Sequence, residues 1–156
     1  MVKEKYSRIK KRYGLPNYEE LERYFRLDKI EDDAYWKLEV LQKIRDKLSE
    51  IIKFLGQYLI TDHDYKIMVE IEAFDDNDFN KIRNLLKKIS ITYNKINMLC
   101  MLNDIDEKEF AELVTEGLEV FKSSQEIIKE LTNKINQHWS KYETNKADEV
   151  EKHYLG

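Results

Sequence analysis

Apolar residues that alternate three and four positions apart run through most of the chain and predict three long amphipathic helices, each with a coiled-coil-like seam. The first should run from about Asp33 to Ile60, and its seam consists of Leu41, Ile44, Leu48, Ile51, Leu55 and Tyr58. The seam of the second consists of Phe79, Ile82, Leu86, Ile89, Tyr93, Ile96 and Cys100. The seam of the third consists of Phe110, Leu113, Gly117, Phe121, Ser124, Ile128, Leu131, Ile135 and Tyr142.

Polar residues mark where the second and third long helices begin. The acidic cluster from Asp75 to Asp78 can cap free amides at the start of the second helix, and Asp106 with Glu109 has the spacing of a capping box. The connection from Asn103 to Ile105 is too short for anything but an antiparallel turn. We therefore expect an up-down bundle whose helices cross at roughly 20°.

Two short helices should precede the bundle. The first carries an apolar stripe and stops at Gly14, with Pro16 soon after, which is a common way for a helix to end. Asn17 and Glu20 then have capping-box spacing for a second short helix. The two predicted stripes are Val2, Tyr6, Ile9 and Tyr13, and Tyr18, Leu21 and Phe25.

Small residues on the third seam predict a close helix contact. Gly117 and Ser124 leave room for a neighbouring backbone, which would offset the roughly 1 kcal/mol that a glycine inside a helix costs relative to alanine. We expect Gly117→Leu to disrupt the packing.

The third helix should extend about 15 Å beyond its predecessor, at about 1.5 Å for each residue. The overhang includes Ile135, Trp139 and Tyr142, and we expect the segment from Asp64 to Phe74 to fold over it. That segment alternates apolar and polar residues, so it is read either as a short helix or as an extended crossover. Residues 1–143 are predicted to form one helical domain, followed by a polar, frayed tail over residues 144–156.

Composition agrees with an all-α, antiparallel bundle of three long helices preceded by two short ones. The chain has four Gly and one Pro among 156 residues, whereas 37% of its residues are charged. Cys100 is its single cysteine, so no disulfide can form within the chain, and no apolar run is long enough to cross a membrane. We expect a cytoplasmic protein without integral membrane association.

One stretch resembles a known family. The run Tyr13-Gly14-Leu15-Pro16-Asn17-Tyr18-Glu19-Glu20-Leu21 is followed by Ile44-Arg45-Asp46-Lys47-Leu48-Ser49-Glu50-Ile51, and Trp139 lies near the end. These elements look like those of small, wholly helical archaeal proteins with a "YGLPxxEEL" element before their long helices. The resemblance implies a helical fold and an archaeal source, and it transfers no activity and no functional residue.

Charge is distributed unevenly. The first 13 residues hold six basic side chains and one acidic one, a net charge of +5, whereas the whole chain carries −4, which leaves −9 on the remainder. Such a cluster, interleaved with tyrosines, can neutralise several phosphates, or it can merely form a solvated basic face beside an acidic body. The candidate partner- or nucleic-acid-binding residues are Lys3, Lys5, Arg8, Lys10, Lys11 and Arg12.

No pattern indicates catalysis, a cofactor or a metal site. The acidic residues around His63 and at Asp75 to Asp78 lack the spacing of a calcium loop, and no Glu lies three residues before any histidine. We interpret both clusters as polar helix caps. Cys100 lies on a predicted seam, where a buried thiol is unreactive. The four glycines are isolated, so no phosphate-binding loop is predicted.

The sequence therefore favours a non-enzymatic helical interaction or regulatory protein that binds a protein or ribonucleoprotein partner. The alternative is an RNA- or ribosome-associated regulatory factor that contacts RNA through residues 3 to 12. Self-association as a homodimer through exposed seam also stays open.

Overall fold

The computed structural model describes residues 1–31 and 34–154, with side chains described as far as residue 142. All regular elements in this part of the chain are helical, which confirms the predicted all-α class. Their bounds are α1 Val2–Tyr13, α2 Tyr18–Phe25, the 3-10 helix η1 Leu27–Lys29, α3 Trp36–Gly56, α4 Tyr65–Ile71, α5 Asp76–Leu102 and α6 Glu107–Tyr154.

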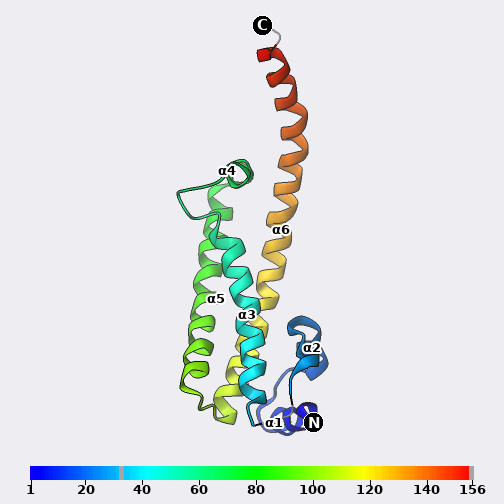
Figure 1. The fold of residues 1–156 in the computed structure, drawn as a ribbon, viewed down its shortest axis with the longest axis vertical. Helices are drawn as coiled ribbons and strands as arrows, with labels where there is room; N and C mark the ends of the chain where they lie inside the picture. The colour runs from blue at the N-terminus through cyan, green and yellow to red at the C-terminus, as the bar shows by residue number, and fades with distance from the viewer. Residues whose placement is uncertain (32–33, 155–156) are drawn as a thin grey trace.

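The long helices α3, α5 and α6 lie side by side, and each contacts the other two (Figure 1). Followed along the chain, α5 runs in the opposite direction to α3 and α6. Leu48 of α3, Ile89 of α5 and Val114 of α6 are fully buried. Burying one side chain of this kind stabilises the fold by roughly 1.5–3 kcal/mol, so the shared interior supplies most of the driving force.

Helices α6 and α3 approach each other closely at Gly117, as predicted from the small size of this residue. A Cβ atom built on Gly117 would lie 2.6 Å from the Cγ2 methyl group of Ile44. The branched Ile44 side chain is stiff and fully buried, so it has little freedom to move away. Gly117 therefore sets the spacing between the two helices.

The buried stripe of α5 differs from the predicted seam. Ile82, Ile89 and Ile96 are buried as expected, but Phe79, Leu86, Tyr93 and Cys100 are only partly buried. The positions one residue earlier are more deeply buried. Because α5 packs against both α3 and α6, the centre of its buried stripe faces the space between these two helices. These positions are Asp78, Leu85, Thr92 and Leu99.

Of the caps predicted for α2, α5 and α6, the last two are confirmed. Asp75 and Asp78 form a reciprocal capping box at the start of α5, and the Asp106 carboxylate accepts hydrogen bonds from the backbone amides of Lys108 and Glu109. The predicted capping box at Asn17 is wrong. Asn17 precedes α2, but its side-chain oxygen accepts a hydrogen bond from Lys10 and makes none to the helix amides.

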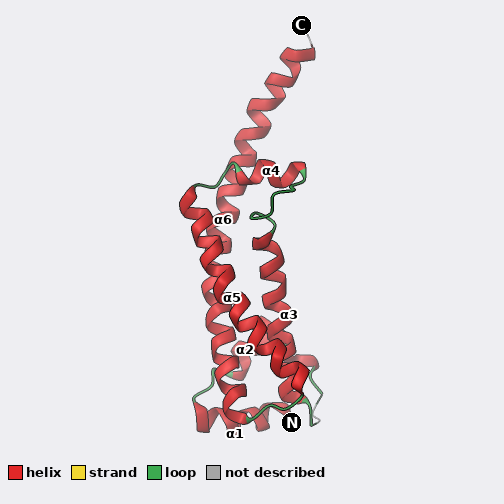
Figure 2. Ribbon diagram, turned by 90° about the vertical axis from the view of Figure 1, so that its left-hand side faces the viewer, coloured by secondary structure: helices red, strands yellow, loops and turns green. Residues whose placement is uncertain are grey.

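Helix α1 lies at one end of the bundle, α2 lies along its side near that end, and α4 lies at the opposite end of α3 and α5 (Figures 1 and 2). At one end α1 and α2 bury their apolar stripes, with the exception of Tyr13, which is 39% exposed just before Gly14 ends α1 in a left-handed conformation. At the other end α4 contacts α6, so the segment expected to cover α6 does so as a short helix.

The bounds of α3 and α6 differ from the predicted ones. The helix predicted from Asp33 to Ile60 spans Trp36–Gly56, and Asp33 lies outside the described residues. The backbone of α6 is helical to Tyr154, past the predicted end of the domain at residue 143. Side chains of the predicted tail, residues 144–156, also lie outside the described part, so its fraying stays a prediction.

We predict that Gly117→Ala lowers the free energy of unfolding by roughly 1–2 kcal/mol. The gain in helix propensity is about 1 kcal/mol, and it is outweighed by overpacking against Ile44, which costs about 1–3 kcal/mol. Urea unfolding monitored by circular dichroism measures the change. Ile44→Leu removes the Cγ2 methyl group that the new Cβ atom would meet. The double variant Gly117→Ala with Ile44→Leu should therefore have a higher free energy of unfolding than the sum of the two single changes predicts. Strict additivity would show that the contact does not limit the spacing.

Candidate functional site

Helix α1, which carries the predicted partner-binding residues, lies across the end of the bundle (Figure 2). Val2, Tyr6 and Ile9 are buried against the rest of the chain, and the Tyr6 hydroxyl donates a hydrogen bond of 2.9 Å to the Pro16 carbonyl. Edge-on ring contacts join Tyr6 to Tyr18 and Phe110. The apolar side of α1 is thus part of the core, and only its polar sides face solvent.

Lys3, Lys10 and Arg12 are engaged within the chain. Lys3 Nζ lies 2.6 Å from Glu19, and this hydrogen bond raises the pKa of Lys3. Arg12 pairs with Glu107 at 2.9 Å, and Lys10 donates to Asn17. Lys5 is half-buried. Contacts to α2 and α6 therefore reduce the free positive charge that the sequence suggests.

Arg8 and Lys11 are the basic residues of α1 best placed for an external anion. Both are exposed, and neither forms an ion pair within the described part of the chain. They are three positions apart on the helix and so face nearly the same direction.

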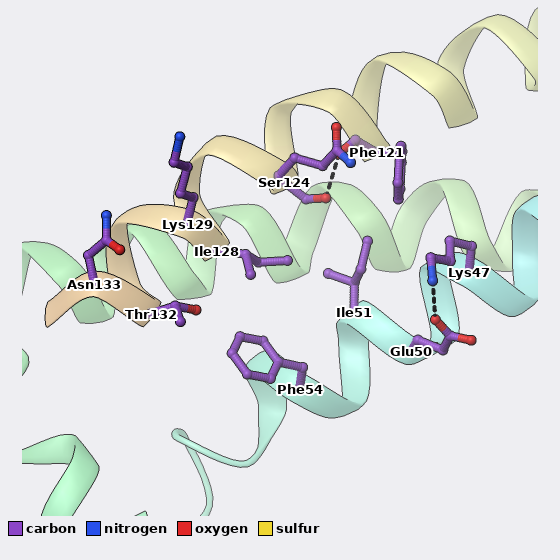
Figure 3. Close-up of a pocket in the computed structure, with 11 residues that line it drawn as sticks. Lys47, Glu50, Ile51, Phe54, Phe121, Ser124, Ile128, Lys129, Thr132 and Asn133 are labelled. Atoms are coloured by element: carbon purple, nitrogen blue, oxygen red, sulfur yellow. Dashed lines mark hydrogen bonds and ion pairs between the residues drawn. The ribbon is translucent and has the colours of Figure 1, made fainter. Parts of the chain in front are cut away.

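An open groove lies between α3 and α6 (Figure 3). Its volume is about 490 Å³, and its floor is formed mainly by Ile51, Phe54, Phe121 and Ile128. Polar side chains stand along it, including Lys47, Glu50, Lys129, Thr132 and Asn133. The groove is apolar at its base and charged at its margin, as a surface for a protein segment should be.

Helix α2 packs beside one end of this groove, at Phe121. Its Tyr24 and Phe25 rings lie 5.3 and 5.2 Å from the ring of Phe121, and Lys122 of α6 pairs with Glu20 of α2. Beyond Phe121 no helix of the described chain covers the floor, and Phe54 and Ile128 are left partly exposed. The sequence placed Ile128 on a core seam, and no residue pattern signals that α2 is too short to cover it.

A buried carboxylate holds α4 against α6. Glu70 accepts a hydrogen bond of 3.0 Å from the Tyr58 hydroxyl and one of 3.3 Å from Trp139 Nε1. Burial and the neighbouring Glu70 charge raise the pKa of Tyr58. The Tyr65 and Tyr142 hydroxyl groups also meet between these helices. Since both oxygens of Glu70 have donors within the chain, its role is structural.

A buried ion pair joins the start of α5 to α6. Lys134 Nζ lies 2.7 and 2.8 Å from the two carboxylate oxygens of Asp78, which is fully buried. Burial acts to raise the pKa of Asp78, but hydrogen bonds from Lys134 and from the Asp75 amide outweigh it and leave that pKa below its usual range. Asp78 was expected only as a cap, and it is also the partner of Lys134.

The remaining chemical groups lie apart from one another. Among the described residues no group of three or more His, Cys, Asp or Glu side chains is placed to hold a metal ion. Asp64 accepts a hydrogen bond from the Ile67 amide and so caps α4. His138 is half-buried and 3.4 Å from Glu72. Burial raises the pKa of the Cys100 thiol, which disfavours the reactive thiolate.

Comparison with known proteins adds no identification. No protein-family profile matches the chain, and no curated protein or solved structure is significantly similar to it. The resemblance to archaeal helical proteins therefore stays a prediction. None of the helices in the described part of the chain combines the length and the apolar character needed to cross a bilayer.

We predict that Asp78→Asn destabilises the fold at pH 7 and that this effect fades in acid. Because folding lowers the pKa of Asp78, its charge stabilises the native state above the ordinary carboxyl range, and this contribution is lost as the pH falls through the folded-state pKa. Removing one partner of a buried pair costs about 3–5 kcal/mol, and we expect roughly 1–3 kcal/mol because Lys134 is partly exposed.

Urea unfolding of the wild type and of Asp78→Asn, followed from pH 7 to pH 3, measures this effect. Asp76→Asn is the matched control, since Asp76 is an exposed carboxylate in the same helical turn. The difference for Asp78→Asn should narrow below about pH 4. A difference that stays constant with pH would contradict a role for its charge.

Proposed function

We propose that this chain is a non-enzymatic, cytoplasmic interaction protein that binds a macromolecular partner. The three long helices act as an antiparallel bundle that serves as its scaffold. The observation that carries the proposal is the open α3–α6 groove (Figure 3). Its apolar floor continues beyond Phe121, the residue on which α2 packs. Exposed apolar side chains that gather in one concave surface are typical of a binding site.

Helix α2 indicates what kind of occupant fits the groove. It is an eight-residue amphipathic helix that places two aromatic rings on Phe121. A helix from a protein partner, entering beyond Phe121, would continue the same packing over Phe54 and Ile128. Lys47, Glu50 and Lys129 at the margin would then contact the polar side of that helix.

The chemistry of the described residues favours binding over catalysis. The two buried carboxylates, Glu70 and Asp78, are both held by donors from other helices, so neither is free to act as a base. Cys100 is the single thiol, and its raised pKa makes it a weak nucleophile at neutral pH.

We predict that Phe54→Ser with Ile128→Ser reduces recovery of the protein partner at least tenfold. The measurement is affinity capture from a lysate of the source cells with identification by mass spectrometry, followed by titration of the recovered partner. Truncating anchors in an apolar pocket commonly costs 2 kcal/mol or more in binding. Ile60→Ser is the control, because Ile60 is exposed beyond the end of α3. Unchanged affinity in the double variant would rule out the groove.

The second candidate function is RNA or ribosome association through α1, which Arg8 and Lys11 favour. If RNA is the partner, we predict that Arg8→Glu with Lys11→Glu abolishes retention of the protein on RNA at low salt. If the partner is a protein, the same double change should leave RNA retention unchanged. Retention on immobilised total RNA and the absorbance of the purified protein at 260 nm distinguish these outcomes. Lys87→Glu with Lys88→Glu is the charge-matched control, since both lysines are exposed on α5.

A further inference from the structure

An apolar surface lies at the end of α5, away from the α3–α6 groove. Met98, Met101 and Leu102 are 55%, 79% and 65% exposed. Spacings of three and four place them on one side of the helix, and Ile91, 47% exposed, lies two turns earlier on that side. We call Met98, Met101 and Leu102 the methionine face. Isolated exposed apolar residues are ordinary, but adjacent ones of this size are not.

Acidic residues of α6 lie beside Met98, the first residue of the methionine face. A cavity of about 190 Å³ between α5 and α6 is lined by Met98, Leu99 and Leu113 together with carboxylates. Glu116 is neutralised there, because Lys95 contacts both its oxygens at 3.1 and 3.0 Å. The remaining acidic side chains of the lining are Glu109 and Glu112, both exposed. Among the described residues, Glu112 pairs with Lys108 at 3.9 Å and Glu109 forms no ion pair.

We propose that the methionine face binds a basic amphipathic helix of a protein partner. Its apolar side would pack on Met98, Met101 and Leu102, and its Lys or Arg side chains would lie beside Glu109 and Glu112. Methionine side chains are flexible and polarizable, so they adapt to different apolar surfaces. Opposite charge at the margin speeds association and selects against acidic helices. The inference deepens the proposed function, on which it rests, by naming the partner class.

Charge argues for this occupant over two others. An anionic lipid surface would be repelled by Glu109 and Glu112. A second copy could offer its own basic helix α1, but the apolar side of α1 is buried in its own fold through Val2, Tyr6 and Ile9. Neither occupant matches an apolar surface with an acidic margin as well as a free basic helix does.

The test uses the full chain and two fluorescent synthetic helical peptides of equal length. One is built from Leu and Lys, and the other from Leu and Glu in the same pattern. Fluorescence anisotropy at about 0.1 M salt should show binding of the Leu/Lys peptide and at least tenfold weaker binding of the Leu/Glu peptide. Met98→Ser with Met101→Ser, and separately Glu109→Lys with Glu112→Lys, should each weaken Leu/Lys binding at least tenfold.

Two controls separate this surface from general acidity and general stickiness. Asp62→Lys with Glu126→Lys makes the same change in net charge at exposed sites elsewhere, and Met68→Ser removes a methionine that is 53% exposed on α4. Both should bind the Leu/Lys peptide as the wild type does. Equal losses in the controls, or equal binding of the two peptides, would overturn the proposal.

Further outcomes distinguish this proposal from the function on which it rests. If Phe54→Ser with Ile128→Ser abolishes peptide binding and the methionine variants do not, the groove is the docking site and only the present inference fails. If the wild type sediments as a dimer that Met98→Ser with Met101→Ser dissociates, and it binds no peptide, the face joins two copies and the inference also fails. Peptide binding lost only in the methionine and Glu109/Glu112 variants supports it.

Discussion

The close approach of α6 to α3 at Gly117 and Ile44 is the constraint on which the rest of the arrangement depends. Without a side chain at Gly117, the two helices come near enough for α5 to pack against both, and the isoleucines of α5 fill the space between them. The face of the α3–α6 pair that α5 does not cover is then left to the short helix α2. Because α2 ends at Phe25, part of that face stays open as the groove.

Buried charged groups hold the helices together at the end of the bundle where α4 lies and α5 begins. The Asp78–Lys134 pair sets the start of α5 against α6, and Glu70 ties α4 to Trp139 on α6. An unpartnered carboxylate in these places would be costly, so each pair tolerates little change in how the helices are aligned. The acidic groups that could have suggested chemistry instead hold helices together. Binding is left to accessible features of the described residues, such as the α3–α6 groove, the methionine face, and Arg8 and Lys11 on α1.

Much of the fold could be predicted from the sequence because helix-forming signals are local. Apolar spacing predicted the long helices, Gly14 and the acidic caps predicted where several of them begin or end, and Gly117 predicted a tight contact. The centre of the α5 stripe was predicted wrongly because Thr92 is polar and yet fully buried, where its hydroxyl donates to Glu116. Asn17 was misread because a distant Lys10 competes for its oxygen, which no local pattern reveals.

The candidate surfaces were harder to predict, because they depend on which parts of the long helices no other helix covers. The length of α2 relative to α3 decides whether Ile128 lies in the core or in a groove, and that is a tertiary property. The methionine face did leave a sequence signal: Met98, Met101 and Leu102 are apolar residues that do not belong to the α5 seam. The basic cluster was visible, but its neutralisation by Glu19 and Glu107 was not.

Native-state amide hydrogen exchange tests the central claim most directly, namely that α3, α5 and α6 share one interior organised around the Gly117–Ile44 contact. Amides near Ile44, Ile89 and Gly117 should exchange with the same free energy as global unfolding, because no one helix can leave the interior alone. Exchange of one of these helices at a free energy several kcal/mol below the other two would contradict the account.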